Sequence, residues 1–262
     1  MFFNIWKSRQ FIYSCVKRDF YARYKGSVLG IVWAIFQPLA MIFVYTIIFS
    51  DIMKSKLNGM ETVPYAYSIY LCTGVLLWGL FTETVINCTN VFLNNANLIK
   101  KVSFPRICLP CIVICSAFIN FIIGFMIFII FLLITGSFPI DTIICFFPIL
   151  IVQTIFSVSI GLGLGVLNVF FRDVGQFLNI ILQFWFWFTP VVYPYNIIPD
   201  KLKGLMDLNP MYQIIHGYQS IFVYNDTPDM LKIGGVLLVS ILISIGTFCL
   251  YKKHVGEMVD EL

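Results

Sequence analysis

The chain has 262 residues, of which 60% are hydrophobic and only 11% are charged, with a net charge of +4. Soluble domains usually have about 45–50% apolar and about 25% charged residues, so this composition excludes a soluble globule. A long disordered chain is excluded as well, because no polar tract of low hydrophobicity is present, and the small charge excess does not indicate nucleic-acid binding. A bilayer core is about 30 Å thick and takes roughly 20 residues per helix, so the chain has room for about six crossings.

Residues 1–26 predict an amphipathic helix that lies in the membrane interface. Ile12 and Val16 share one helical face, and Arg18 lies opposite. Arg23 falls on the apolar side, from where its long aliphatic stem can reach the headgroup layer. The segment is not a secretory signal peptide, because it has no cleavable apolar core before a small-residue site.

Six apolar stretches follow, which we predict to cross the bilayer as helices. They cover residues 27–50, 65–92, 107–134, 142–169, 176–190 and 231–250. The expected fold is therefore one all-α membrane domain over 1–262. Its first five spans occupy 27–190, its sixth occupies 230–252, and a charged tail fills 253–262.

The segment 191–229, between the fifth and sixth spans, mixes prolines with aromatic and polar residues. It is too apolar for a solvated loop and too interrupted for a crossing helix, which favours a re-entrant or interfacial hairpin. We expect two short helices in it, over 200–208 and 210–223. Pro210 favours the second start, because proline suits the first turn of a helix.

The distribution of basic residues predicts the orientation. If the N-terminus is cytoplasmic, most of the 17 lysines and arginines lie in segments on the inner side. Inner segments of membrane proteins carry such an excess. Six crossings then also place the C-terminus in the cytoplasm.

Motifs of enzyme sites are missing from the sequence. It contains no Gly-x-x-x-x-Gly-Lys-Ser/Thr phosphate loop, so we expect no ATP site. Cys108 and Cys111 have the spacing of a metal pair, but no second Cys/His pair accompanies them, so no metal site is expected. The run Gly161-x-Gly163-x-Gly165 has the wrong spacing for a dinucleotide site and is better explained by close packing of helices.

Two titratable residues stand out. Glu83 is the one clear carboxylate within a predicted span, and such an acid is by default a functional hypothesis. A proton relay would need a basic partner, and no span supplies one, so a structural hydrogen-bonding role is favoured over proton coupling. His216 lies in the 191–229 segment and could touch a substrate, although such a histidine is more often structural.

Aromatic residues form 17% of the chain, and some of them belong to interfacial belts. Phe177, Phe184 and Phe188 align on one face of the fifth predicted span, and Trp33 and Phe36 align less strictly in the first. Core packing and lipid contact explain such residues. The alternative is a pore with aromatic walls, because sugar rings stack their C–H faces on aromatic rings.

Four stretches of the sequence occur in a characteristic order. They are Arg18-Asp19-Phe20-x-x-Arg23-Tyr24-x-x-Ser27-x-Leu29-Gly30, Asn97-Leu98-Ile99-x-Lys101-x-x-Phe104-Pro105, Phe170-Phe171-Arg172-Asp173-Val174 and Thr189-Pro190-Val191-x-Tyr193. With them the chain resembles the membrane subunit of type-2 ABC exporters of lipid-linked polysaccharides, a family that moves O-antigen, capsule or teichoic acid. The stretches together span nearly the whole chain.

The resemblance implies a transport subunit, not an enzyme, that forms a homodimer in the cytoplasmic (inner) membrane. Two separate ATP-binding cassette subunits would hold ATP and Mg²⁺, so this chain would have no cofactor. The expected substrate is an undecaprenyl-diphosphate-linked glycan, O-antigen in the first place, which passes through a channel at the dimer interface. The alternatives are an ABC permease for a small lipid or drug, an integral membrane enzyme that modifies glycans or lipids, and a secondary transporter that uses Glu83.

The resemblance also implies roles for individual residues. Aromatic residues expected along the channel are Trp33, Phe36, Phe177, Phe184, Trp185 and Phe188. Basic residues expected to hold the lipid diphosphate at the inner leaflet, or only to fix topology and contact anionic lipids, are Arg18, Arg23 and Lys25. The loop expected to contact the ATPase comprises Asn97, Leu98, Lys100, Lys101, Phe104 and Pro105. The outer gate is expected to contain Tyr193, Tyr195, Pro210, Tyr212 and His216.

Overall fold

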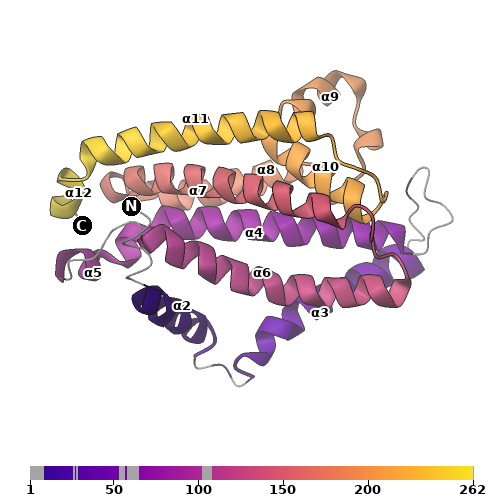
Figure 1. Ribbon diagram of the computed structural model, residues 1–262, viewed down its shortest axis with the longest axis horizontal. Coiled ribbons are helices and arrows are strands. Elements are labelled where there is room, and N and C mark those ends of the chain that lie inside the picture. The colour runs from indigo at the N-terminus through magenta and orange to yellow at the C-terminus, as the bar shows by residue number, and fades with distance from the viewer. Residues whose placement is uncertain are drawn as a thin grey trace.

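The structure, a computed structural model, describes residues 9–25, 27, 29–52, 57, 65–101 and 108–261. Over these ranges the chain is helical and has no β-strand (Figure 1). The helices are α2 (Arg9–Tyr24), α3 (Val32–Tyr45), α4 (Ala66–Asn94), α5 (Ala96–Lys101), α6 (Cys108–Thr135), α7 (Phe146–Phe170), α8 (Asp173–Trp187), α9 (Asp200–Asp207), α10 (Pro210–Phe222), α11 (Met230–His254) and α12 (Glu257–Glu261). A π-helical segment, η1 (Thr46–Ile52), continues α3, and short 3-10 helices, η2 (Ile143–Cys145) and η3 (Tyr195–Ile197), precede α7 and α9.

Helix α4 lies at the centre of the bundle, with α6, α7, α8, α10 and α3 packed around it. Its buried face includes Phe81, Val85 and Cys88, which belong to apolar clusters shared with α7 and α10. Lipid is as apolar as these side chains, so close packing, and not escape from water, is what holds such helices together.

Helices α4 and α7 approach each other closely. A methyl group added to Gly161 would lie 2.6 Å from Cβ of Cys88, and one added to Gly165 would lie 2.7 Å from the carbonyl oxygen of Cys88. Both distances are too short for a side chain, so only glycine fits. The two glycines are four residues apart, the spacing that lets membrane helices touch along their backbones. The prediction that this glycine run serves helix packing is confirmed.

Five of the described helical segments are long and apolar enough to cross a membrane: 32–49, Ala66–Asn94, Cys108–Thr135, 143–170 and Met230–His254. The fifth predicted span is present as α8, but this helix begins at Asp173 and ends at Trp187. Its 15 residues rise about 22 Å, which is less than the thickness of a bilayer core. The remaining predicted spans agree with the helices to within a few residues.

Helix α2 takes the place of the predicted interface helix from residue 9 onward, and residues 1–8 lie outside the described part. Cys15 and Val16 are buried against Ile112 of α6. The apolar face predicted to rest on lipid therefore rests in part on protein, and α2 is fixed to the bundle along α6.

The two short helices predicted between the last spans are also present, as α9 and α10. Helix α10 begins where expected, because Pro210 occupies its first turn and the side chain of Asn209 accepts the N–H of Met211 at 3.1 Å. Such a cap satisfies a donor that the helix start leaves open. Nearly all of α10 is buried against α4, α7 and α11, so the segment is an integral part of the fold.

Candidate functional site

Two helices present broad aromatic surfaces. Trp33 and Phe36 of α3 meet edge to face with ring centroids 5.6 Å apart, and both are exposed. On α8, Phe177, Phe184 and Phe188 are exposed by about 60% or more of their surface. The alignment predicted for these phenylalanines is thus found on a free face of α8.

Trp185 is only partly exposed: it lines one open hollow with Phe184 and Phe188, but its ring also packs inward. Its ring packs edge to face against Phe81 of α4 at 5.4 Å and Phe156 of α7 at 6.2 Å. Its Nε1 donates a hydrogen bond of 2.9 Å to Oδ1 of Asn209, which ties α8 to the cap of α10. Trp185 therefore contributes mainly to the packing of α8, whereas the side chain of the neighbouring Phe184 is exposed.

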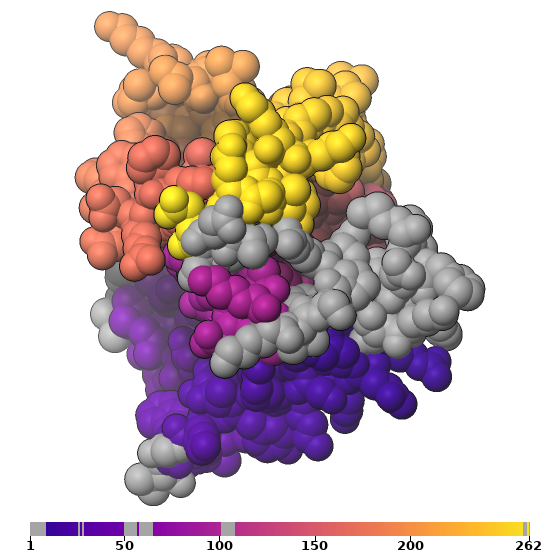
Figure 2. Space-filling model, turned by 90° about the vertical axis from the view of Figure 1, so that its left-hand side faces the viewer, coloured from indigo at the N-terminus to yellow at the C-terminus, as the bar shows by residue number. Residues whose placement is uncertain are grey.

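A strip of α4 lies between α3 and α8, each of which packs on α4. Trp78 turns toward α8, where it contacts Trp185 and Phe186, and Leu76 turns toward Pro38 of α3 and Gly124 of α6. The intervening face carries Gly79, which is exposed, and Glu83, which is half-buried. Figure 2 looks along the bundle and shows α8, in salmon, to the left of its centre.

Glu83 has the basic partner that no span was predicted to supply. Arg23, from α2, donates through Nη2 to Oε1 of Glu83 at 2.8 Å, and Asn120 of α6 donates through Nδ2 to the same oxygen at 2.6 Å. The side chains of Glu83 and Arg23 are 24% and 42% exposed. The structural role predicted for Glu83 is supported by these bonds, but the partner comes from the interface helix. A carboxylate in a span is costly unless it is paired in this way.

The ion pair borders a cavity of about 310 Å³ between α2, α3, α4 and α6. Gln37 and Asn120 add polar groups to its wall, and Pro38, Leu76 and Phe121 add apolar ones. Sequence reasoning missed this cavity. Two signals pointed to it: an arginine on the apolar side of α2, and a lone acid in a span.

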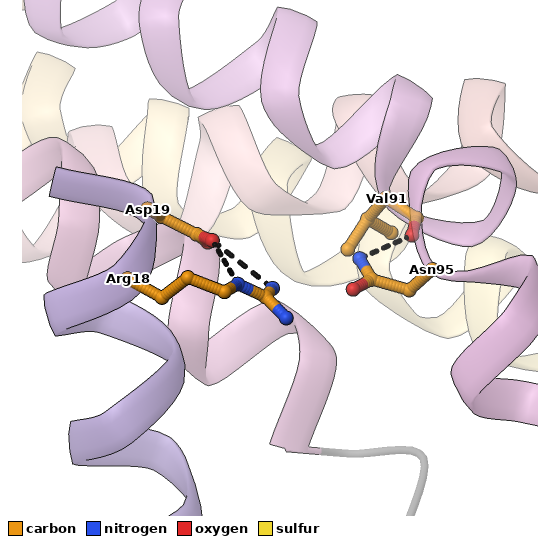
Figure 3. Close-up of polar contacts among 4 residues, drawn as sticks. All are labelled: Arg18, Asp19, Val91 and Asn95. Atoms are coloured by element: carbon orange, nitrogen blue, oxygen red, sulfur yellow. Dashed lines mark hydrogen bonds and ion pairs between the residues drawn. The ribbon is translucent and has the colours of Figure 1, made fainter. Parts of the chain in front are cut away.

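The three predicted basic residues at the inner leaflet separate. Arg18 lies beside Asp19 and donates to its carboxylate at 3.1 and 3.2 Å, an exposed pair at the surface of α2 (Figure 3). Arg23 turns inward to Glu83, and Lys25 is exposed beyond the end of α2. Arg18 and Lys25 border one open groove between α2 and the start of α3, so these two basic residues lie on one groove and Arg23 lines a different cavity.

The loop predicted to contact an ATPase begins as α5, which holds Asn97, Leu98 and Lys100. The side chain of Asn95 bonds back to the carbonyl of Val91 at 2.8 Å and closes the turn from α4 into α5 (Figure 3). Figure 2 shows α5, in magenta, at the end of the molecule that faces the viewer. The side chain of Lys101 and all of Phe104 and Pro105 lie outside the described residues.

The residues predicted for the outer gate are joined by tyrosines. Tyr195 stacks on Tyr212 with centroids 5.2 Å apart, and its hydroxyl lies 3.3 Å from both carboxylate oxygens of Asp207. Tyr193 donates its hydroxyl to the carbonyl of Trp187. These contacts link the α8–α9 connection to α10.

A buried tyrosine of α4 fastens the turn after α8 to the bundle. The Tyr70 hydroxyl lies 3.0 Å from the carbonyl oxygen of Pro190 and 2.9 Å from that of Tyr193. A hydroxyl has one proton and can donate to either. The turn after α8 is therefore held by α4, which lies about 120 residues earlier in the chain.

His216 follows Tyr212 by one turn of α10, and their rings lie 5.5 Å apart. The pKa of His216 is lowered from its usual 6.5, mainly because partial burial disfavours the charged imidazole and to a smaller extent because of the positive charge of Lys232. The carboxylates of Asp207 and Asp229 act in the opposite direction. The imidazole is accordingly neutral at pH 7.

We predict that titration of His216 gives a pKa below 6.5, and that Lys232→Gln raises it. The signal is the ring resonance of labelled histidine in the purified protein, and His254→Gln leaves His216 as the single histidine. A pKa at or above 6.5, or one that does not respond to Lys232→Gln, would contradict this account.

Comparison with known proteins adds a direct finding. Residues 10–223 match the ABC-2 type transporter family. An O-antigen export system permease protein RfbA from Myxococcus xanthus is 26% identical over 261 residues, which is 99% of this chain and 98% of the relative. Two proteins of that name from Klebsiella pneumoniae are 27% identical over 90% of this chain and 88% of the relative, and 30% identical over 79% and 77%.

Proposed function

Because the chain belongs to the ABC-2 type transporter family, we propose that it is the membrane-spanning subunit of an ABC exporter for a lipid-linked polysaccharide, O-antigen in the first place. The observation that carries this proposal is its similarity, over most of both chains, to three relatives named as O-antigen export permeases. The apolar spans make it a multi-pass membrane protein. The proposal includes the cytoplasmic membrane as its location.

Energy would come from two ATP-binding cassette subunits at the cytoplasmic end. The sequence has no phosphate loop of its own, and α5 lies exposed at one end of the bundle. Docking there would couple ATP hydrolysis to α4, because α5 follows α4 after a single turn closed by Asn95. Both termini would lie on this same side.

The channel would form between two copies of the chain. Their contact would bring together the aromatic surfaces of α3 and α8, with the Gly79–Glu83 strip of α4 between them. Support comes from Phe177, Phe184 and Phe188, which are exposed in the single chain. Aromatic rings on such a surface can stack on successive sugars without selecting a particular sugar. This property suits a polymer substrate.

The test is deletion of the gene for this chain in its source cell, followed by analysis of the surface glycan and the intracellular glycan. We expect surface polysaccharide to disappear and the lipid-linked precursor to accumulate inside, and we expect the affinity-purified chain to bring an ATP-binding cassette subunit with it. Unchanged surface glycan together with loss of small-lipid or drug efflux would favour a different ABC cargo. A chain that purifies without an ATPase, but modifies a glycan or lipid in vitro, would favour an enzyme.

A point variant tests the docking site within the same experiment. Lys100→Ala removes an exposed charge from α5 and is expected to weaken ATPase copurification. Lys201→Ala, an exposed lysine on α9 in the outer segment, is the matched control. Equal ATPase recovery for the two variants would argue against docking at α5.

A further inference from the structure

The polar groups around Glu83 are not fully used by the protein. Oε1 of Glu83 accepts both the Arg23 and the Asn120 hydrogen bonds, so Oε2 accepts none within the described structure. Oδ1 of Asn120 is buried and also lacks a hydrogen-bond partner among the described residues. Buried acceptors are almost always satisfied in folded proteins, so the unpaired Oδ1 of Asn120 is unusual, whereas Oε2 of Glu83 belongs to a partly exposed side chain and is open to a ligand or water.

The charge of the site is balanced. Arg23 neutralises Glu83 at 2.8 Å, and no further charged side chain is found among the described residues that line the cavity. An anion would meet the Glu83 carboxylate, and a cation would meet the Arg23 guanidinium. An uncharged ligand rich in donors therefore suits the site better than an ion.

Hydroxyl groups match the remaining partners. Each hydroxyl both donates and accepts, so it can donate to Oε2 of Glu83 and also pair with the amide of Gln37, which is exposed on the cavity wall. The cavity volume of about 310 Å³ is at the lower end of the range of about 300–1,000 Å³ for small-molecule sites. Pro38 and Leu76 offer an apolar surface on the other side, as the C–H face of a sugar ring requires.

Two residues of the cavity also belong to the channel wall proposed above. Glu83 and Gly79 belong to the α4 strip between α3 and α8, and Glu83 stands 11 residues before the end of α4 at Asn94, about 16 Å from the α5 end of the helix. Nothing lies within 4 Å of the position of a Cβ on Gly79, so a ligand can approach the α4 backbone there.

We propose that the cavity bordered by Arg23, Gln37, Glu83 and Asn120 binds the hydroxyl groups of one saccharide unit of the exported glycan near the cytoplasmic end of the pathway. This inference rests on the export function proposed above. The ion pair then has two tasks: Oε1 of Glu83 holds α2 and α6 to α4, while Oε2 faces the sugar. Along the rest of the path, the aromatic surfaces of α3 and α8 would contact the sugars.

The test uses the chain with its ATPase partner in lipid nanodiscs, and as probe a repeat-unit oligosaccharide cut from the cell's own surface polysaccharide. Binding is measured by calorimetry and export by glycan surface display. Gln37→Leu removes an exposed amide that makes no hydrogen bond to any residue the structure describes, and Glu83→Gln keeps the Oε1 acceptor but removes the charge. We expect each to weaken oligosaccharide binding about ten-fold, the effect of losing one good hydrogen bond to a charged or well-placed group.

Ser116→Ala is the matched control, because its hydroxyl is buried one turn from Asn120 but does not line the cavity. It should bind and export as the wild type does. If the wild type exports glycan but fails to bind the oligosaccharide, or if Gln37→Leu and Glu83→Gln both bind it normally, the saccharide site is wrong while the export function stands. A wild type that exports no glycan overturns both.

Discussion

Replacement of Gly161 by leucine is expected to prevent the chain from folding stably in the membrane. The added side chain would meet Cβ of Cys88 at 2.6 Å and the carbonyl oxygen of Val85 at 2.9 Å. These atoms belong to the helix itself and cannot turn aside as the end of a flexible side chain can. Overpacking costs about 1–3 kcal/mol, occasionally more, and we expect a loss of at least about 3 kcal/mol here. The measurement is the thermal midpoint and yield of the purified protein in detergent.

A control on another helix separates this effect from the mere addition of bulk. Gly234 of α11 has nothing within 4 Å of the position of its Cβ. Gly234→Leu should therefore change the thermal midpoint little. Equal midpoints for wild type, Gly161→Leu and Gly234→Leu would show that α4 and α7 are not in close contact.

The second large effect is expected from Trp185→Ala. This change empties the space between Phe81 and Phe156 and leaves the Asn209 side chain without its indole donor. Truncation of a packed tryptophan usually costs about 3–5 kcal/mol, and we expect a loss in that range, seen as a lower thermal midpoint. Phe184→Ala, at a residue 64% exposed, should leave the midpoint near that of the wild type.

The same pair of variants also separates packing from transport. If Phe184 lies along the glycan path, Phe184→Ala reduces export from a protein of normal stability, whereas Trp185→Ala reduces export in proportion to the protein lost. A stable Trp185→Ala protein would contradict the packing assigned to Trp185.

Most of the fold could be predicted from the sequence because its signals are local. Long apolar runs locate the crossing helices, and Asn209-Pro210 locates the start of α10 to the residue. The glycine run at Gly161 predicted close packing, although not that α4 would be the partner. Helix α8 was harder, because Asp173 can begin a helix three residues before the apolar stretch and Pro190 ends the stretch later than the helix does.

The candidate site was less predictable because its contacts join distant parts of the chain. Arg23 and Glu83 are 60 residues apart, and each appeared out of place by itself: one on an apolar face, the other in a span. Trp185 was grouped with the exposed phenylalanines because neighbours on a helix differ by about a quarter turn. Which of these aromatic side chains faces inward depends on where α4 and α7 pack against α8, and the sequence does not show this.

The unbroken length of α4 has a mechanical consequence. Its 29 residues rise about 43 Å, with the turn into α5 at one end and the Tyr70 hydroxyl, bonded to the carbonyls of Pro190 and Tyr193, near the other. A straight helix of this length shifts as a rod, so a displacement imposed at the α5 end also displaces the outer turn. The α5 end of the bundle and the turn after α8 are thereby mechanically linked. If the proposed pathway runs along α4, we expect its two ends to open together and not in alternation.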